Sequence, residues 1–560
     1  MSEFANDYRT LAAEKKLQRQ NKIPKEWLLS SDKYHGFSNF LDVPTTCGIL
    51  NAVEYKITSD YDATALLEQL KAGIWSVEQV TIAFCKRAAI AQQLCNCLTE
   101  IFFDEAIQRA RHLDQERHEN PTKTLPPLYG LPISLKDSFQ VMGHDTSTGL
   151  ACFVNQPAEE NSAAVAMLLD LGAILYCKTN LPQSIMTGDS DNNVFGRTLN
   201  PHNTSLTAGG STGGESALLA LRGSVLGVGT DIGGSNRVPA VCNGIYGFRP
   251  SVGLVPHGGV RDLSVPGTDG VRSTVGPMAT SLRDCALFLK SIMQAETWRY
   301  DSTVVSVPWR DLTAKKNLRI GLVEDDGVYT PSPPVRRGLQ KAADLLRKSG
   351  SIEIVPLALP NVKEHYQDLV QYFALLGSEN YYELFARTGE PPVPSLSGLG
   401  LLSVQGTTLR GFFDLNVRRA EAAETYLKLF RDNRIDAILM PPAPHTAVPL
   451  DTWNRATYTG LWNYLDYPAI VFPVDKVQAS DLADDPSNAK YGPEDSRLYN
   501  LCNLSTSLFG QSIDSSHLDT GPELYKNAPI CIQLVGYRHM DEVLVNTATV
   551  LDSIINGQKP

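Results

Sequence analysis

Two serines, each set among glycines, lie close together near the middle of the 560-residue chain. Ser211 stands in residues 208–215 (AGGSTGGE), and Ser235 stands in residues 227–237 (GVGTDIGGSNR). Glycine allows positive φ and a close approach of the backbone to a ligand, so each serine can occupy a turn whose amide N–H groups point the same way. A hydroxyl nucleophile beside such N–H groups can stabilise an oxyanion. We therefore expect acyl-transfer chemistry here, and a base that activates one of these serines.

Histidine is the first candidate for that base. Residues 209–213 match the G-x-S-x-G pattern of a nucleophile elbow around Ser211, with His517 or His539 downstream. A strand directly precedes such an elbow, whereas residues 201–208 are rich in Asn, Thr and Ser and are typical of a loop. None of the ten histidines has a distinctive context, so each is better explained as a surface or internally hydrogen-bonded residue.

Lysine is the second candidate, and it acts as a base only when it is neutral, because it is desolvated or near other positive charge. Lys136 ends the apolar segment 131–136, whereas most lysines of the chain lie on polar helix faces. On that context alone, a strand-end lysine that reaches solvent is the more common case. A phosphate-binding loop is the third interpretation, but no Gly-Lys-Ser/Thr follows either loop, and Glu215 brings the wrong charge to the helix start.

The string from Gly209 to Pro250 closely resembles the signature of the amidase signature family, which runs G-G-S-S-G-G-E, then G-x-G-T-D-I-G-G-S-I-R-x-P, then G-x-Y-G-L-[KR]-P. Residues 131–137 (LPISLKD) resemble the lysine motif of that family, and residues 178–180 and 200–201 are further landmarks. Residues 23–27 (IPKEW) look like the acetamidase-type branch of filamentous fungi. Fatty-acid amide hydrolases are the next closest branch.

The resemblance implies a role for each matching residue. Ser235 would attack the amide carbonyl, Ser211 would relay protons, and Lys136 would begin neutral and act as the base. The oxyanion would be held by consecutive backbone N–H groups, those of Ile232, Gly233, Gly234 and Ser235. The residues expected to support the two loops are Gly210, through a cis peptide to Ser211, and Thr230, Asp231 and Arg237. A plain turn residue is an equally good interpretation of Asp231.

Two positions depart from the family pattern. Thr212 replaces the usual second serine, and Asn236 stands where isoleucine is usual, directly after Ser235. Neither change removes a catalytic group. We expect them to affect substrate preference, through the pocket wall or the Ser235 rotamer, and not the class of reaction.

Composition excludes several other classes of function. The formal net charge of −11 and the lack of a Lys/Arg stripe argue against a nucleic-acid partner. Residues 1–32 have no apolar core, and no run of about 18 apolar residues occurs, so we expect no signal, no membrane span and a cytoplasmic protein. The ten cysteines lack the spacing of metal sites, so we expect no metal and no disulfide framework. The amide hydrolysis that the resemblance implies needs no cofactor, and none is expected. The expected partner is a small-molecule amide, and a homodimer is one possible assembly.

Helical and strand patterns alternate along the chain and predict one large α/β domain. The expected fold is a central twisted mixed sheet with helices on both sides over residues 61–560, preceded by a helical arm over residues 1–60. Ser76 and Gln79 make a capping box for a helix to about Gln93. Residues 479–496 are polar and are expected to form a surface loop.

The family leaves the substrate open. Small primary amides are the first expectation, and longer N-acyl amides or aryl esters are the alternative. The alternative is favoured by apolar residues that could line an entrance, although they could equally pack in the core: Leu399, Leu401, Leu402, Phe412 and Phe413. An amidotransferase subunit with an obligate partner is a further interpretation. A catalytically silent binding protein is disfavoured because both serines and the lysine are present.

Overall fold

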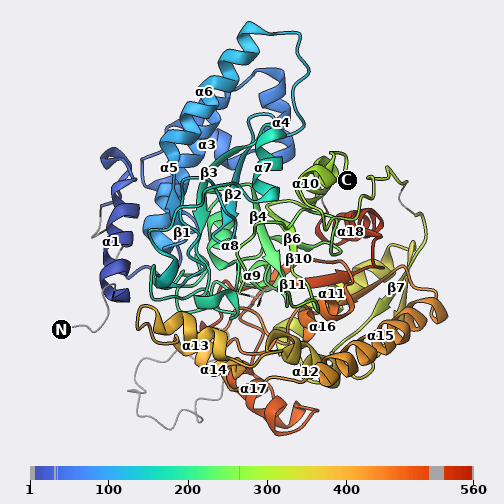
Figure 1. Ribbon diagram of the computed structural model, residues 1–560. Coiled ribbons are helices and arrows are strands. Elements are labelled where there is room, and N and C mark those ends of the chain that lie inside the picture. Colours follow the sequence, from blue (N-terminus) through green and yellow to red (C-terminus); the bar gives the residue numbers. More distant parts are fainter. Residues whose placement is uncertain are drawn as a thin grey trace.

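The computed structural model describes residues 7–30, 33–34, 36–263, 265, 267–313, 315–503 and 523–557 (Figure 1). These residues form a single α/β domain around an 11-stranded sheet with the order β1-β3-β2-β4-β6-β5-β10-β11-β9-β7-β8. The strands are β1 (Leu98–Ile101), β2 (Pro132–Lys136), β3 (Ile174–Thr179), β4 (Leu226–Asp231), β5 (Tyr246–Arg249), β6 (Thr274–Ala279), β7 (Leu318–Leu322), β8 (Ile352–Pro356), β9 (Ala437–Met440), β10 (Ala469–Lys476) and β11 (Pro529–Val535).

The sheet is mixed, as the sequence predicts. β2 runs parallel to both of its neighbours, β3 and β4, and β7 runs parallel to β8 and β9, while the remaining pairs are antiparallel. The carboxyl ends of β2, β3 and β4 therefore meet at one edge of the sheet. In open α/β sheets this edge is where ligands usually bind.

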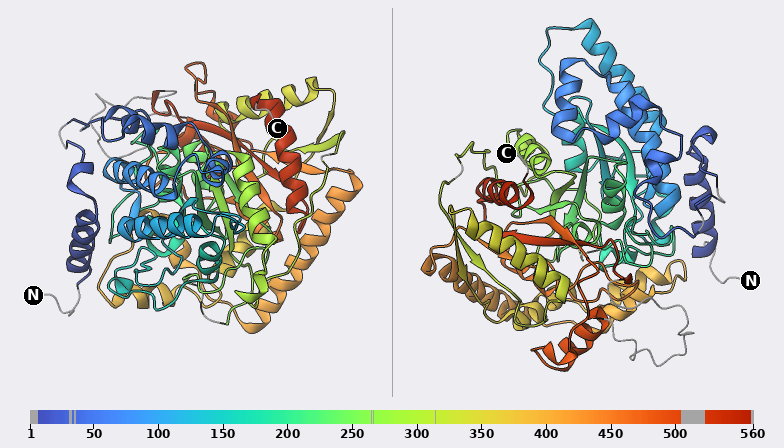
Figure 2. Two further views of the ribbon diagram at one scale, coloured as in Figure 1. Left: turned by 90° about the horizontal axis from the view of Figure 1, so that it is seen from above. Right: turned by 180° about the vertical axis from the view of Figure 1, so that it is seen from behind.

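Helices cover both faces of the sheet. Successive residues of a strand point to opposite faces, and in β11 Ile530 lies against Gly338 of α11 while the Cys531 thiol contacts the Ala240 carbonyl of α9. The helices are α1 (Tyr8–Asn21), α2 (Val43–Thr46), α3 (Ala52–Ser59), α4 (Ala63–Ala72), α5 (Val77–Cys95), α6 (Phe103–Glu119), α7 (Ala163–Asp170), α8 (Gly213–Ala220), α9 (Arg237–Asn243), α10 (Leu282–Met293), α11 (Pro333–Lys348), α12 (Val362–Phe373), α13 (Glu379–Ala386), α14 (Pro394–Leu399), α15 (Leu409–Asp432), α16 (Thr457–Leu465), α17 (Pro493–Asn503) and α18 (Asp541–Asn556). Figure 2 shows α10 and α18 side by side, although they are far apart in the sequence.

A local sequence signal explains the start of α5. The predicted capping box at the start of α5 is present, with Ser76 and Gln79 exchanging side-chain and backbone hydrogen bonds.

The N-terminal helix α1 lies along the outside of the body, beside β1 (Figure 1). The division of the chain at residue 60 stays a prediction. Among the helices of the described residues, none combines the length and apolarity needed to cross a membrane.

The prediction of a surface loop over residues 479–496 is wrong in its last part, because α17 begins at Pro493. Proline in the first turn, followed by Glu494 and Asp495, is a helix-start signal. The Asp495 carboxylate is buried and accepts hydrogen bonds from the backbone N–H groups of Thr330 and Tyr491. This contact between distant segments fixes the helix start.

Candidate active site

Lys136, Ser211 and Thr230 meet at the carboxyl end of β2. Lys136 is the last residue of that strand, and its side chain is fully buried. Its Nζ lies 2.7 Å from Ser211 Oγ and 2.9 Å from Thr230 Oγ1. Because β4 runs parallel to β2, Thr230 near its end reaches the same edge of the sheet. The alternative of a strand-end lysine that reaches solvent is therefore wrong.

Burial lowers the pKa of Lys136 to about 7, since the interior solvates an ammonium group poorly, and the carboxylate of Asp231 acts in the opposite direction. A lysine with this pKa is substantially neutral at neutral pH and can accept a proton. Because Lys136 Nζ lies 2.7 Å from Ser211 Oγ, it can accept the proton of that hydroxyl. The arrangement can thus activate a serine without histidine.

The loop that carries Ser211 has no room for a side chain at residue 210. The peptide between Gly210 and Ser211 is cis, as the family resemblance implies. A Cβ on Gly210 would lie 2.2 Å from the carbonyl oxygen of Thr187, so only glycine fits. Residues 201–208 hold no strand, which removes the structural basis of a nucleophile elbow at Ser211.

The second loop leaves β4 after Asp231 and turns through Ile232 to the half-buried Ser235. Gly234 has φ 128°, and a Cβ there would lie 2.3 Å from Thr459 Oγ1. The backbone N–H of Thr212 donates to the carbonyl of Ser235 at 3.2 Å and joins the two serine loops. The two serines predicted from separate motifs therefore belong to one site.

The Asp231 carboxylate holds the second loop from inside. It accepts hydrogen bonds from the N–H of Gly234 at 2.8 Å and from that of Asn236 at 3.2 Å. Of the four N–H groups predicted to bind the oxyanion, that of Gly234 already donates to Asp231. The N–H groups of Ile232, Gly233 and Ser235 remain for the oxyanion. Asp231 is consequently more than a plain turn residue.

Arg237 neutralises Asp231. Its Nε lies 3.0 Å from one carboxylate oxygen and its Nη2 3.1 Å from the other, with both side chains fully buried. Burial would raise the pKa of Asp231, but the charge and hydrogen bonds of Arg237, with a hydrogen bond from Asn463, bring it down to about 2. The pair therefore stays ionised.

Two further residues, which none of the sequence motifs includes, hydrogen-bond to the Asp231–Arg237 pair. Arg237 also donates to Gln533 Oε1 at 2.7 Å and to Asn463 Oδ1 at 2.6 Å, and Asn463 donates to Asp231 at 2.9 Å. A signal existed for Gln533, which is a polar residue in the otherwise apolar strand β11. Asn463 lies on α16, where nothing in its local sequence marks it.

The two departures from the family pattern touch each other. Thr212 Oγ1 lies 3.3 Å from Asn236 Oδ1, and both residues are fully buried. Asn236 Nδ2 donates to the carbonyls of Phe248 and Gly276 at 3.3 and 3.2 Å. Neither Thr212 nor Asn236 lines the two cavities described next. They therefore shape the support behind Ser235 and not the pocket wall.

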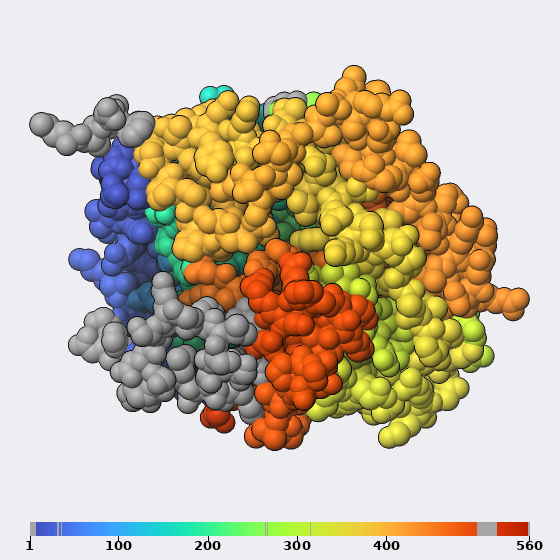
Figure 3. All heavy atoms as spheres, turned by 90° about the horizontal axis from the view of Figure 1, so that it is seen from below, coloured from blue at the N-terminus to red at the C-terminus, as the bar shows by residue number. Residues whose placement is uncertain are grey.

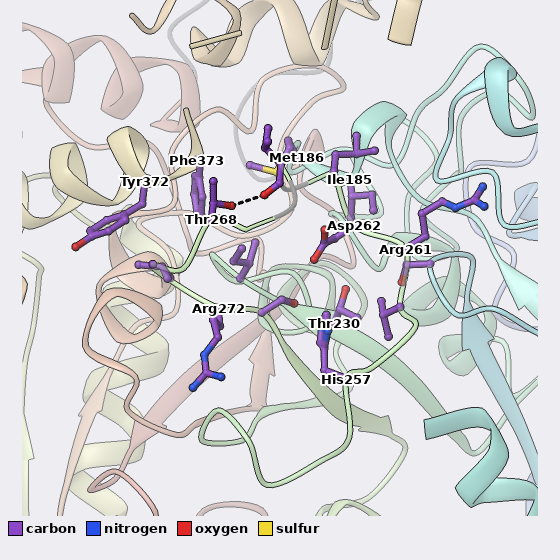
Figure 4. A pocket seen from close by; sticks show the side chains of 18 of the residues that line it. Ile185, Met186, Thr230, His257, Arg261, Asp262, Thr268, Arg272, Tyr372 and Phe373 are labelled. Atoms are coloured by element: carbon purple, nitrogen blue, oxygen red, sulfur yellow. Dashed lines mark hydrogen bonds between the residues drawn. The ribbon is translucent and has the colours of Figure 1, made fainter. Parts of the chain in front are cut away.

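Two cavities meet at Ser235. The first, of about 410 Å³, is bounded by both serines and Thr230. Figure 4 shows Met186 and Phe373 across this cavity from Thr230 and His257, while Arg261 and Arg272 direct their guanidinium groups away from it. A substrate atom in this space can reach the serine in contact with the lysine.

The second cavity, of about 370 Å³, adjoins the other side of Ser235 and is lined by Gly210, Gly233 and Gly234. Its outer wall is largely apolar and aromatic, with Tyr329, Tyr366, Leu369, Val370, Phe373, Leu399, Leu401 and Trp453. On the face seen in Figure 3 the surface is hollowed between residues 376–404 and α17. Both segments contribute to this cavity, through Leu399, Leu401 and Glu494.

The five residues predicted to form an apolar entrance do not lie around one cavity. Leu399 and Leu401 line the second cavity. Leu402 packs in a small apolar cluster around Leu396, and Phe412 lies edge-on to Tyr372. Phe413 is 52% exposed on α15. Only two of the five residues can therefore contact a ligand in this cavity.

The histidine alternative gains no support. His517 lies outside the described residues. His539 follows β11, and its backbone N–H donates to Ser251 Oγ at 2.9 Å; the residue lines neither cavity. No histidine hydrogen bond to Ser211 occurs among the described residues.

A buried lysine that contacts a serine at the carboxyl end of a strand can serve acyl transfer, and comparison with known proteins identifies the family. The family model Amidase matches residues 79–545. An acetamidase of Aspergillus oryzae is 36% identical over 549 residues, which cover 95% of this chain and 96% of that protein. An amidase of Gibberella moniliformis is 37% identical over 560 residues, covering 98% and 99%. The solved structure of fatty acid amide hydrolase matches with a TM-score of 0.89 at 29% identity, covering 98% of this chain and 96% of that one. The chain belongs to the amidase signature family and is an amide-hydrolysing enzyme.

Proposed function

We propose that the protein hydrolyses carboxylic amides through an acyl-enzyme on Ser235. Ser211 takes the proton of the Ser235 hydroxyl while it gives its own proton to neutral Lys136, and Ser235 Oγ bonds to the amide carbon. The observation that carries this proposal is the 2.7 Å contact between a buried lysine of lowered pKa and Ser211, in a cavity that Ser235 also lines.

The negative charge that develops on the carbonyl oxygen is held by the backbone N–H groups of Ile232, Gly233 and Ser235. Asp231 supports this loop by fixing Gly234, and Arg237 keeps Asp231 in place. One well-placed donor of this kind is typically worth about 3 to 4 kcal/mol in the transition state.

Collapse of the intermediate breaks the C–N bond. The proton held by Lys136 returns through Ser211 to the leaving nitrogen, which departs as ammonia or an amine. Water then enters, gives a proton to the same relay, and attacks the acyl carbon. The carboxylic acid leaves, and Ser235 regains its proton.

We propose small or medium aliphatic and aryl amides as substrates, which the acetamidase relatives support at 36% identity. Longer N-acyl amides or esters are the second candidate. They are favoured by the apolar lining of the second cavity, and by the match to fatty acid amide hydrolase. We further propose that the protein acts in the cytoplasm on small molecules, with no nucleic-acid partner, and that it can form a homodimer.

A panel of amides tests the substrate class. Purified chain alone should release ammonia or amine from acetamide, propionamide, benzamide and acetanilide, and should process oleamide more slowly, as measured by kcat/KM for each. Activity without any added protein would also exclude an obligate amidotransferase partner. Turnover confined to oleamide would overturn the small-amide proposal, and no turnover of any amide would overturn the proposed function.

The pH profile tests the protonation state of Lys136. Because its pKa is about 7, the neutral form required of a base prevails above that pH and is lost below it. We expect log kcat/KM for acetanilide to be flat from about pH 8 to 9 and to fall with a slope of about one per unit below about pH 6.5. A profile that stays level down to pH 5 would contradict the assignment of the base.

A further inference from the structure

A second buried lysine stands beside the first. Lys178 lies in β3, the parallel neighbour of β2, and is fully buried. Its Nζ lies 2.9 Å from Asp137 Oδ1, and Asp137 directly follows Lys136. Whereas Lys136 contacts only hydroxyl and carbonyl oxygens, Lys178 is held by a carboxylate. The ion pair therefore fixes the residue next to the proposed base.

The loop of residues 145–147 closes over this pair. Lys178 Nζ also donates to the carbonyl of Asp145 at 2.5 Å and to Thr146 Oγ1 at 2.9 Å. The other oxygen of Asp137 accepts from the backbone N–H and the hydroxyl of Ser147, at 3.1 and 2.6 Å. The position of Asp137 thus depends on the position of this loop.

The loop is in turn held by the N-terminal helix. Lys15 of α1 is buried, and its Nζ lies 2.7 Å from Asp145 Oδ2 and 2.5 Å from Glu100 Oε1. Glu100 belongs to β1, and Asp145 Oδ2 also accepts from the backbone N–H of Asn155. Lys15 contacts both carboxylates, so a continuous set of polar contacts runs from α1 to the end of β2, through the carboxylate and then the backbone carbonyl of Asp145.

Removal of Lys15 would leave the buried carboxylate of Asp145 and the partly buried carboxylate of Glu100 without their shared cation. Buried charges without partners are costly, so Asp145 would turn toward water. Its loop would move with it and release Ser147 and Lys178 from Asp137. The end of β2 would then loosen, and water would reach Lys136.

We propose that Lys15 of α1 is a positioning residue for Lys136, acting through Asp145, Lys178 and Asp137. This inference rests on the proposed role of Lys136 as the base. It makes the N-terminal helix part of the active-site framework, although no atom of α1 lines either cavity.

The test replaces Lys15 with methionine, and Lys16→Met, an exposed neighbour on the same helix, is the matched control. For full-length Lys15→Met we expect kcat to fall by between about 10- and 100-fold with KM little changed, because a small displacement of a reacting group has effects of this size. The acid limb of the kcat/KM profile should move to higher pH by about half a unit or more, because access of water relieves the burial that lowers the pKa of Lys136. Asp231 of β4, the charged group that acts directly on Lys136, is unchanged in this variant.

Lys16→Met should match the wild type in both readings. A Lys15→Met enzyme with a lower melting temperature but wild-type kcat and acid limb would overturn the inference, since the charges would then serve only stability. If Lys15→Met does not fold, the variant Asp145→Asn tests the inference by the same two measurements, kcat and the acid limb of the kcat/KM profile. The amide of asparagine keeps the size of the aspartate side chain. An active Lys136→Ala enzyme would instead mark failure of the proposed function.

Discussion

Lys136→Ala is expected to lower kcat/KM by about three to five orders of magnitude, in the range seen when a catalytic base that acts as a unit with its nucleophile is removed. Among the described residues, the contact with Lys136 Nζ is the only hydrogen bond of Ser211 Oγ. Without it, neither serine hydroxyl has an acceptor for its proton.

The fold should survive this change. Lys136 has no carboxylate partner, so the substitution leaves no buried charge unpaired, and the Asp231–Arg237 pair stays intact. Circular dichroism and the melting temperature check the fold, Lys136→Met keeps the volume, and Lys16→Ala controls for the loss of an exposed lysine. Turnover within about tenfold of the wild type in both Lys136 variants would show that another group is the base.

The two serines should differ in the size of their effects, and this difference is the second prediction. Ser235→Ala removes the atom that bonds to the substrate, so kcat/KM should fall by about five to six orders of magnitude. Ser211→Ala removes only a proton relay, and proton transfer by a positioned group contributes about two to four orders. The measurement is kcat/KM for acetanilide with both variants and with Thr212→Ser as a control.

Thr212→Ser restores the usual family residue and should stay within a few-fold of the wild type, because Thr212 lines neither cavity. The reverse order, with Ser211→Ala the more damaging change, would assign nucleophilic attack to Ser211. Equal losses in the two variants would mean that the serines act as one unit without separate roles.

Local sequence patterns predict much of this structure because the physics behind them is local. The capping box at Ser76, the strand that ends at Lys136 and the glycine loops around both serines each depend on a few neighbouring residues. The alternation of strands and helices predicts the α/β class, whereas the mixed sheet was an implication of the family resemblance. These patterns made the lysine and both serines candidates, and the family resemblance implied the role of each.

Contacts between distant segments could not be predicted in this way. Asn463 and Gln533 reach Arg237 from α16 and β11, and Lys15 reaches Asp145 from α1, because the fold brings these elements together. The hydrogen bond from the Gly234 N–H to Asp231 depends on the backbone shape of one turn, which residue types do not specify. The alternatives for Lys136, solvent exposure or burial, were separated only by the strands packed around it.

Peptide mapping of a covalent adduct tests the central claim most directly. Wild-type enzyme treated with a fluorophosphonate should gain the mass of one adduct and lose activity in proportion, and fragmentation should place the adduct on Ser235. Lys136→Ala should label far more slowly at the same residue. An adduct on Ser211 would contradict the account, because Ser211 would then be the nucleophile and the lysine its immediate base.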